Sequence, residues 1–170
     1  MRTARRSLAA PAVLVAAALI AAGATAAAPA AGCPAGDRDV RASTRAGAAT
    51  RLVPPGASSV RLCRYRGLDP PSEADRLISG RLIVAATTTR MLADELDAIP
   101  VTTGVYSCPA DLGSSVVAYF RYRSGPPDPV TIGLSGCELV SNGRVHRTGG
   151  VSPAGRTAIA DVLAALRGTS

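Results

Sequence analysis

Lysine and tryptophan are absent from the 170 residues of the chain, and histidine and phenylalanine each occur once. A phosphate-binding loop needs a lysine after its glycines, so the glycine-rich residues 148–150 are predicted to form turns instead. His146 carries the only imidazole, and no two cysteines have the C-x-x-C spacing, so a structural zinc site of the usual kind has no ligand set. We therefore expect neither a metal ion nor a cofactor.

The sequence also lacks the marks of a catalytic centre. A Ser-His-Asp triad would have to use His146, which no Gly-x-Ser-x-Gly motif accompanies and which falls in a predicted hairpin. We interpret His146 as a solvent-facing residue of a strand. The acids Asp94, Glu95 and Asp97 crowd one polar helix face, as on an ordinary solvated surface. We predict a protein that is not an enzyme, and an enzyme using His146 is the least supported alternative.

The long apolar run of the chain is confined to its N-terminal residues. Arginines at positions 2, 5 and 6 precede apolar residues 8–22, and Ala24-Thr25-Ala26 follow, which is typical of a signal peptide covering residues 1–26. The run is too short and too rich in alanine for a permanent span, which needs about 20 strongly apolar residues. We predict secretion. The alternative is a lipoprotein held at the outer face of the membrane by a lipid on Cys33, which follows Ala30-Ala31-Gly32.

The four cysteines are predicted to form two disulfides, because an exported chain folds in an oxidising compartment. They are Cys33, Cys63, Cys108 and Cys137. Four cysteines allow three pairings, and we favour Cys33 with Cys63 and Cys108 with Cys137 because each pair brackets a plausible local unit. Cysteine catalysis needs a free thiolate, and in this arrangement none is left.

The positive charge of the chain comes from arginine alone. The 19 basic residues and 12 acids give a net charge of +7, and loss of the three arginines in residues 1–26 leaves +4. An arginine-only composition also follows from a GC-rich coding sequence, so we do not expect a nucleic acid as partner.

Arginines near two predicted strands are candidates for a basic patch that binds an anionic cell-wall polymer. Arg121 and Arg123 lie on one strand, and Arg61 and Arg64 lie on another, where alternation places them on opposite faces. Three tyrosines near these strands would add stacking: Tyr65, Tyr119 and Tyr122. We take Arg121 and Arg123 as candidate anion-binding residues, with an arginine-decorated soluble surface as the alternative.

The composition divides the chain after its first 57 residues. Residues 27–57 are rich in Ala, Gly, Pro, Thr and Arg without apolar periodicity, which predicts a flexible linker. Residues 58–170 are predicted to form a single domain.

Periodicity within that domain predicts both strands and helices. Strands are expected over residues 58–65, 77–84, 115–123 and 130–134, and Asn142-Gly143 predicts a further hairpin. One helix is expected from an N-cap at Thr87 or Thr88 to Ile99, and another from Pro153, with Ser152 as N-cap and Gly168 after its last turn. The sum is an α+β fold: an antiparallel sheet of about four to six strands with two helices packed on one face and two disulfides.

Several of these segments together resemble a set of small secreted actinobacterial proteins of unknown function. The resemblance covers most of residues 58–145 and implies a fold and a location but no activity. The segments that carry it are Val60-x-Leu62-Cys63-Arg64-Tyr65, Leu96-Asp97-Ala98-Ile99-Pro100, Cys108-Pro109, Phe120-Arg121-Tyr122, Gly136-Cys137 and Val140-Ser141-Asn142-Gly143.

The helix before Cys108-Pro109, with a cysteine about 30 residues later, also resembles subtilisin-inhibitor-like proteins. The resemblance implies a protease-binding loop made by Pro109, Ala110 and Asp111. The chain departs from that family because it has no cysteine between Cys63 and Cys108 and because a helix follows its last cysteine. We predict a non-catalytic extracellular binding or structural module, with a protease inhibitor as the alternative.

Overall fold

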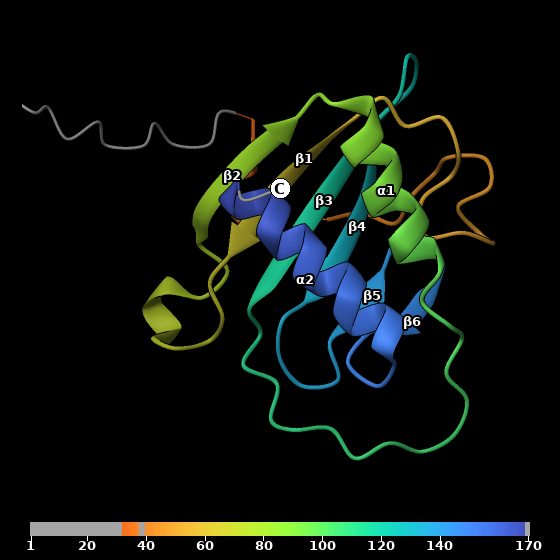
Figure 1. Cartoon of the computed structure of the whole chain (residues 1–170). Helices are drawn as coiled ribbons and strands as arrows, with labels where there is room; N and C mark the ends of the chain where they lie inside the picture. The colour runs from red at the N-terminus through yellow and green to blue at the C-terminus, as the bar shows by residue number, and fades with distance from the viewer. Residues whose placement is uncertain (1–31, 38–39, 169–170) are drawn as a thin grey trace, which may run out of the picture.

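A six-stranded antiparallel sheet in the order β2-β1-β3-β4-β5-β6 forms the centre of the computed structural model (Figure 1). The structure describes residues 32–37 and 40–168, so the predicted signal peptide lies outside the described residues. Within the described residues, no helix combines the length and the apolar character that crossing a bilayer requires. The predicted α+β fold with its antiparallel sheet is confirmed.

The elements follow the predicted order along the chain. The strands are β1 (Ser59–Tyr65), β2 (Leu77–Ile83), β3 (Ser115–Arg121), β4 (Asp128–Gly133), β5 (Leu139–Ser141) and β6 (His146–Thr148). The helices are α1 (Ala86–Asp97) and α2 (Pro153–Arg167), and a short 3-10 helix, η1 (Pro71–Glu73), precedes β2. The Asn142-Gly143 hairpin forms as predicted, with β5 antiparallel to β6.

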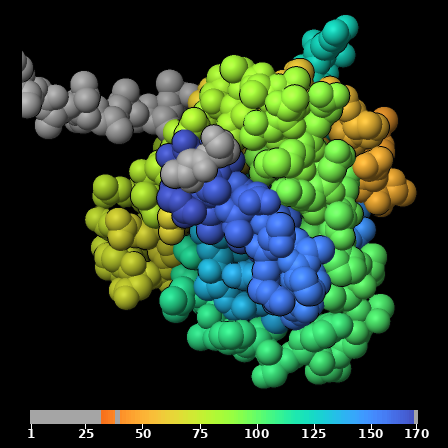
Figure 2. Space-filling model, in the orientation of Figure 1, coloured from red at the N-terminus to blue at the C-terminus, as the bar shows by residue number. Residues whose placement is uncertain are grey.

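Both helices cover the same face of the sheet, here called the helix face (Figures 1 and 2). Leu92 and Leu96 of α1 and Val162 of α2 are fully buried against it. Each buried aliphatic side chain of this kind contributes about 1.5–3 kcal/mol. The sheet supplies the other half of this core: Val60, Leu62, Ile83, Val116, Ala118, Phe120, Val130, Ile132 and Val140.

The ends of α2 match the sequence, whereas the ends of α1 do not. At α2 the Ser152 hydroxyl accepts a hydrogen bond from the Gly155 amide at 3.0 Å, and Gly168 takes the left-handed conformation that closes the helix. The predicted threonine N-cap of α1 is wrong, because the helix begins at Ala86 after Ala85, which makes no side-chain cap. Since β2 ends at Ile83, only two residues remain to reach the helix layer, and this short connection sets the start of α1.

Residues 40–57, expected as part of a flexible linker, are packed onto the domain. Leu52 and Val53 are each 1% exposed and join the core on the helix face. Asp97 at the end of α1 accepts hydrogen bonds from the Leu52 amide at 2.7 Å and the Val53 amide at 3.1 Å. The linker prediction failed here because single polar side chains from distant elements hold this segment, and such contacts leave no periodic pattern in the sequence.

The first disulfide fixes the start of the N-terminal segment, residues 32–37 and 40–57, to the face of the sheet opposite the helices, here called the outer face. Cys33 is bonded to Cys63 of β1, and Cys108 to Cys137, so both predicted pairings are confirmed. Val117 and Tyr65 form a second small core around the first bridge. A sulfur held in a disulfide cannot carry a thioether lipid, and the pairing of Cys33 therefore opposes the lipoprotein alternative.

Asn142 in the hairpin turn is predicted to be a stability determinant. Its Nδ2 group donates to the carbonyl oxygens of Ala48, Arg51 and Leu52 at 2.8–3.1 Å, and its Oδ1 accepts from the Arg144 and Val145 amides. Because Asn142→Ala leaves several buried groups unpaired, it should lower the free energy of unfolding by about 2–4 kcal/mol in urea denaturation. Ser141→Ala, which removes one exposed bond of the same turn, should cost less than about 1 kcal/mol. Equal losses would show that Asn142 does not hold the segment.

A carboxyl pair between the two helices is predicted to make stability depend on pH. Burial, together with the charge of Asp161 and a hydrogen bond to it, raises the pKa of Glu95 to about 7. The folded state therefore holds a proton that the unfolded chain releases at lower pH, so stability falls as pH rises toward about 7.

Glu95→Gln should melt close to wild type near about pH 5, and at about pH 8 it should be more stable by an amount on the order of 1–3 kcal/mol. Thermal unfolding at the two pH values measures the difference. Asp94→Asn, which neutralises an exposed acid of the same helix, is the control and should show no such pH-dependent gain. A constant difference between Glu95→Gln and wild type at both pH values contradicts the assignment.

Candidate functional site

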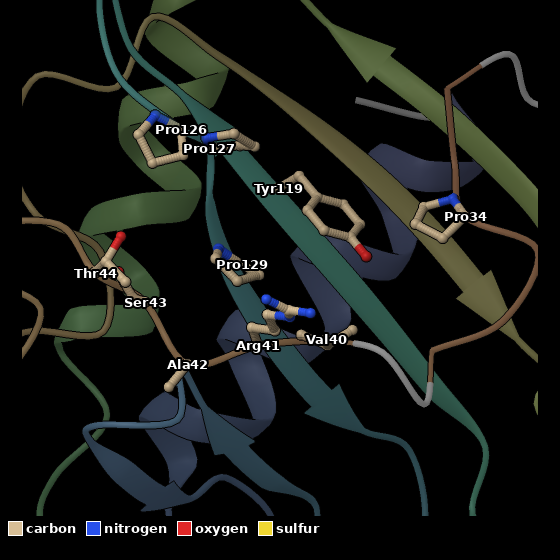
Figure 3. A pocket seen from close by; sticks show the side chains of 10 residues that line it. All are labelled: Pro34, Val40, Arg41, Ala42, Ser43, Thr44, Tyr119, Pro126, Pro127 and Pro129. Carbon is tan, nitrogen blue, oxygen red and sulfur yellow. The ribbon is translucent and has the colours of Figure 1, made fainter.

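Two adjoining hollows lie on the outer face of the sheet, and we call them together the outer groove; Figure 3 shows the first of them. The first has a volume of about 370 Å³, and its walls include Pro34, Arg41, Tyr119, Pro126, Pro127 and Pro129. The second, of about 190 Å³, shares Pro34, Tyr119 and Pro127 and adds Arg61 and Arg121. The groove thus has proline walls, one aromatic ring and three guanidinium groups.

Strand register brings the floor of the groove together. Tyr119 in the middle of β3 lies opposite Arg61 of β1 on one side and Pro129 of β4 on the other. Directly opposed residues of an antiparallel pair have Cβ atoms about 4.5–5.5 Å apart, so these three side chains form one row across the sheet. Arg121 follows two residues after Tyr119 and therefore points to the same face, opposite Ser59.

The charges of the groove are unbalanced. Within the described part of the chain, neither Arg61 nor Arg121 forms a salt bridge, and no aspartate or glutamate lines the two hollows. Asp37 lies nearby, where its carboxylate accepts a hydrogen bond from the Ser115 hydroxyl. Arg61 and Arg121, at the other end of the groove, therefore leave a local excess of positive charge there.

Tyr119 keeps its phenol proton in this setting. Burial is the main cause that raises the pKa of Tyr119, and the negative charge of Asp37 adds to the effect. The neighbouring Tyr65 hydroxyl donates to the Pro34 carbonyl oxygen at 3.1 Å, and burial raises the pKa of that phenol as well. Both rings are therefore neutral at physiological pH, and Tyr119 offers an aromatic surface without a repelling charge to an anionic ligand.

The proline wall is held by an arginine from the N-terminal segment. The Arg45 guanidinium lies 3.5 Å from the centroid of the Tyr122 ring and donates to the Ser124 and Pro126 carbonyl oxygens at 2.7 and 3.2 Å. Asp128 is fully buried beside it, where burial raises the pKa of the carboxyl and the nearby Arg45 charge opposes the rise. Arg45 thus acts as a positioning residue for the loop that carries Pro126 and Pro127.

The structure separates the arginines that the sequence grouped. Arg121 lies in the groove, whereas Arg123 is exposed in the loop beyond β3 and lines neither hollow. Arg64 lies opposite Val116 and so points to the helix face, as alternation predicted. Arg41 and Pro34 were missed, because both belong to the segment interpreted as a linker, and only the fact that a disulfide starts there signals a fixed position.

The predicted inhibitory residues lie on an exposed loop between α1 and β3. Every residue from 103 to 112 is exposed, including Pro109, Ala110 and Asp111. The Cys108 disulfide fixes one side of Ala110.

Hydrogen bonds fix the other side of Ala110. Asp111 Oδ1 accepts from the Ser135 hydroxyl at 2.6 Å and from the Gly113 amide at 2.8 Å, which lowers the pKa of Asp111. The Ser135 hydroxyl oxygen in turn accepts from the Leu112 amide. The loop therefore presents Pro109 and Ala110 between two anchors.

His146 stands apart from both features. It is exposed at the start of β6 and is not among the residues that line the outer groove. The groove consequently contains no histidine that would serve as a general base.

Comparisons with protein-family models, curated proteins and solved structures found no match for this chain. The groove and the loop must therefore be interpreted from their own chemistry.

Proposed function

We propose that the chain is a non-catalytic extracellular binding module that holds an anionic cell-wall polymer in the outer groove. The observation that carries the proposal is the row of Arg61, Tyr119 and Pro129, extended by Arg121, in the outer groove, where no acid is among the lining residues that the structure describes. Guanidinium groups bind phosphate and carboxylate oxygens through paired hydrogen bonds, and a polymer with regularly spaced anions fits an open groove with several of them.

The walls of the groove suit a bound chain that does not react. Proline side chains are rigid and apolar, and they offer no proton donor or acceptor. Tyr119 is neutral near pH 7 as an ordinary phenol is, and burial raises its pKa further, so it contributes contact area and not charge. Two disulfides without a free cysteine in the described residues agree with an oxidising compartment outside the cell.

Immobilised poly(glycerol phosphate) and polygalacturonate test the groove with phosphate and carboxylate anions, respectively. Wild-type protein should bind at least one of them, and retention should weaken as salt rises because salt screens these exposed charges. Arg61→Ala and Arg121→Ala should each raise the dissociation constant by about tenfold or more, as expected for loss of a hydrogen bond to a charged group.

Arg167→Ala, which removes the same charge from the last turn of α2, is the matched control and should bind as wild type does. Neutral dextran should not be retained. Equal losses in all three variants would mean that only the overall charge matters, and no retention of either polymer by wild type would reject the proposed function.

A second candidate function is inhibition of a subtilisin-like protease by the loop after Cys108. The observation that favours it is the position of Pro109 and Ala110 between the Cys108 disulfide and the hydrogen bonds of Asp111. A loop pre-ordered on both sides of the contact residues loses little entropy on binding, which favours tight association with an enzyme cleft.

Titration of a subtilisin-like protease with the intact protein tests this second function. Inhibition should approach one molecule per enzyme, and Ser135→Ala should weaken it and speed cleavage of the loop, because the bonds of Ser135 to Asp111 and to the Leu112 amide are lost. Ser114→Ala, a change in the same connection outside these hydrogen bonds, serves as the control. Absence of inhibition by wild type at micromolar concentrations would remove this candidate.

A further inference from the structure

The β2 strand ends the sheet and presents an unpaired edge. It pairs with β1 on one side, and within the described residues no strand pairs with its other side. About half of the backbone N–H and C=O groups of an edge strand point away from the sheet, where they are free to pair with another extended chain.

The usual protections of an edge strand are weak along β2. The strand contains no proline, and its one charged residue, Arg81, lies against the end of α2, where Nη1 occupies the space that a Cβ on Gly168 would need. Apolar side chains are exposed instead: Ile78 is 49%, Leu82 is 41% and the following Val84 is 74% exposed. Exposed apolar groups along an edge whose one charged side chain lies against the end of α2 favour pairing with a partner strand.

The sequence of β2 is nearly symmetric about Gly80. Ile78 and Leu82 are equidistant from it, and so are Leu77 and Ile83, while Ser79 and Arg81 flank it. In an antiparallel pair of two identical strands centred on Gly80, Ile78 of each copy would lie opposite Leu82 of the other, twice by symmetry. A glycine inside a strand weakens it and often marks a place where another backbone approaches closely.

We propose that a second copy of this chain pairs antiparallel along β2, with Gly80 at the twofold axis, to form one continuous sheet across a dimer. The chain itself limits the length of the pairing, because the Leu77 amide already donates to the Ala35 carbonyl oxygen at 3.1 Å. The shared stretch is therefore centred on residues 78–82. Leu82 lies opposite Arg61 and so sits on the outer face, which brings the apolar contacts of the dimer to that side.

Sedimentation equilibrium across a range of protein concentrations tests this dimer. Wild type should show a mass that rises from monomer to dimer with concentration. Leu82→Arg should raise the dimer dissociation constant at least about tenfold, because it places two like charges in the apolar contacts. Val101→Arg is the matched control, since Val101 is also exposed, at 66%, but lies in the loop after α1; it should dimerise as wild type does.

Amide hydrogen exchange locates the contact. Those amides of residues 78–82 that point away from β1 should exchange more slowly as the protein concentration rises, and those of β6 at the opposite edge should not change. A monomer at every concentration up to about 1 mM overturns the proposal. A dimer that Leu82→Arg leaves intact overturns it as well, because the contact would then lie elsewhere.

Discussion

The disulfide between Cys33 and Cys63 is the constraint on which the outer side of the molecule depends. Without a covering layer, the outer face of β1 and β3 would expose Tyr65 and Val117, which are both fully buried. The bridge fixes the start of the N-terminal segment there, and by the chain-entropy model a loop of this size contributes roughly 3–4 kcal/mol. The segment then follows the sheet and passes to the helix face, where Asp97 and Asn142 hold it.

The groove is a consequence of this arrangement. One wall comes from the disulfide-bonded N-terminal segment at Pro34 and Arg41. The other comes from the loop that Arg45 holds through its hydrogen bonds to the Ser124 and Pro126 carbonyl oxygens. The sheet contributes only the floor, with Tyr119 at its centre. A binding surface made in this way is fixed by long-range contacts, so changes far from the ligand that loosen the segment should alter the groove as well.

Local sequence patterns predicted the helices and strands, and long-range contacts explain the features that these patterns missed. The strands could be derived from alternation of apolar and polar residues, and the ends of α2 from Ser152 and Gly168. The two disulfides could be derived from the number of cysteines. The packing of Leu52 and Val53 left no such pattern, since it depends on partners more than 40 residues away. The candidate site was found in part: Arg121 was identified, but its neighbours across the strands depend on register.

Hydrogen exchange of the N-terminal segment in the oxidised protein tests most directly that this segment is a structural layer. The account predicts slow exchange at the Ser43, Leu52 and Val53 amides, which donate to the Asn142 carbonyl oxygen and to Asp97, at rates close to those of strand amides in β3. Exchange at the rate of an unstructured chain at all three positions would contradict it.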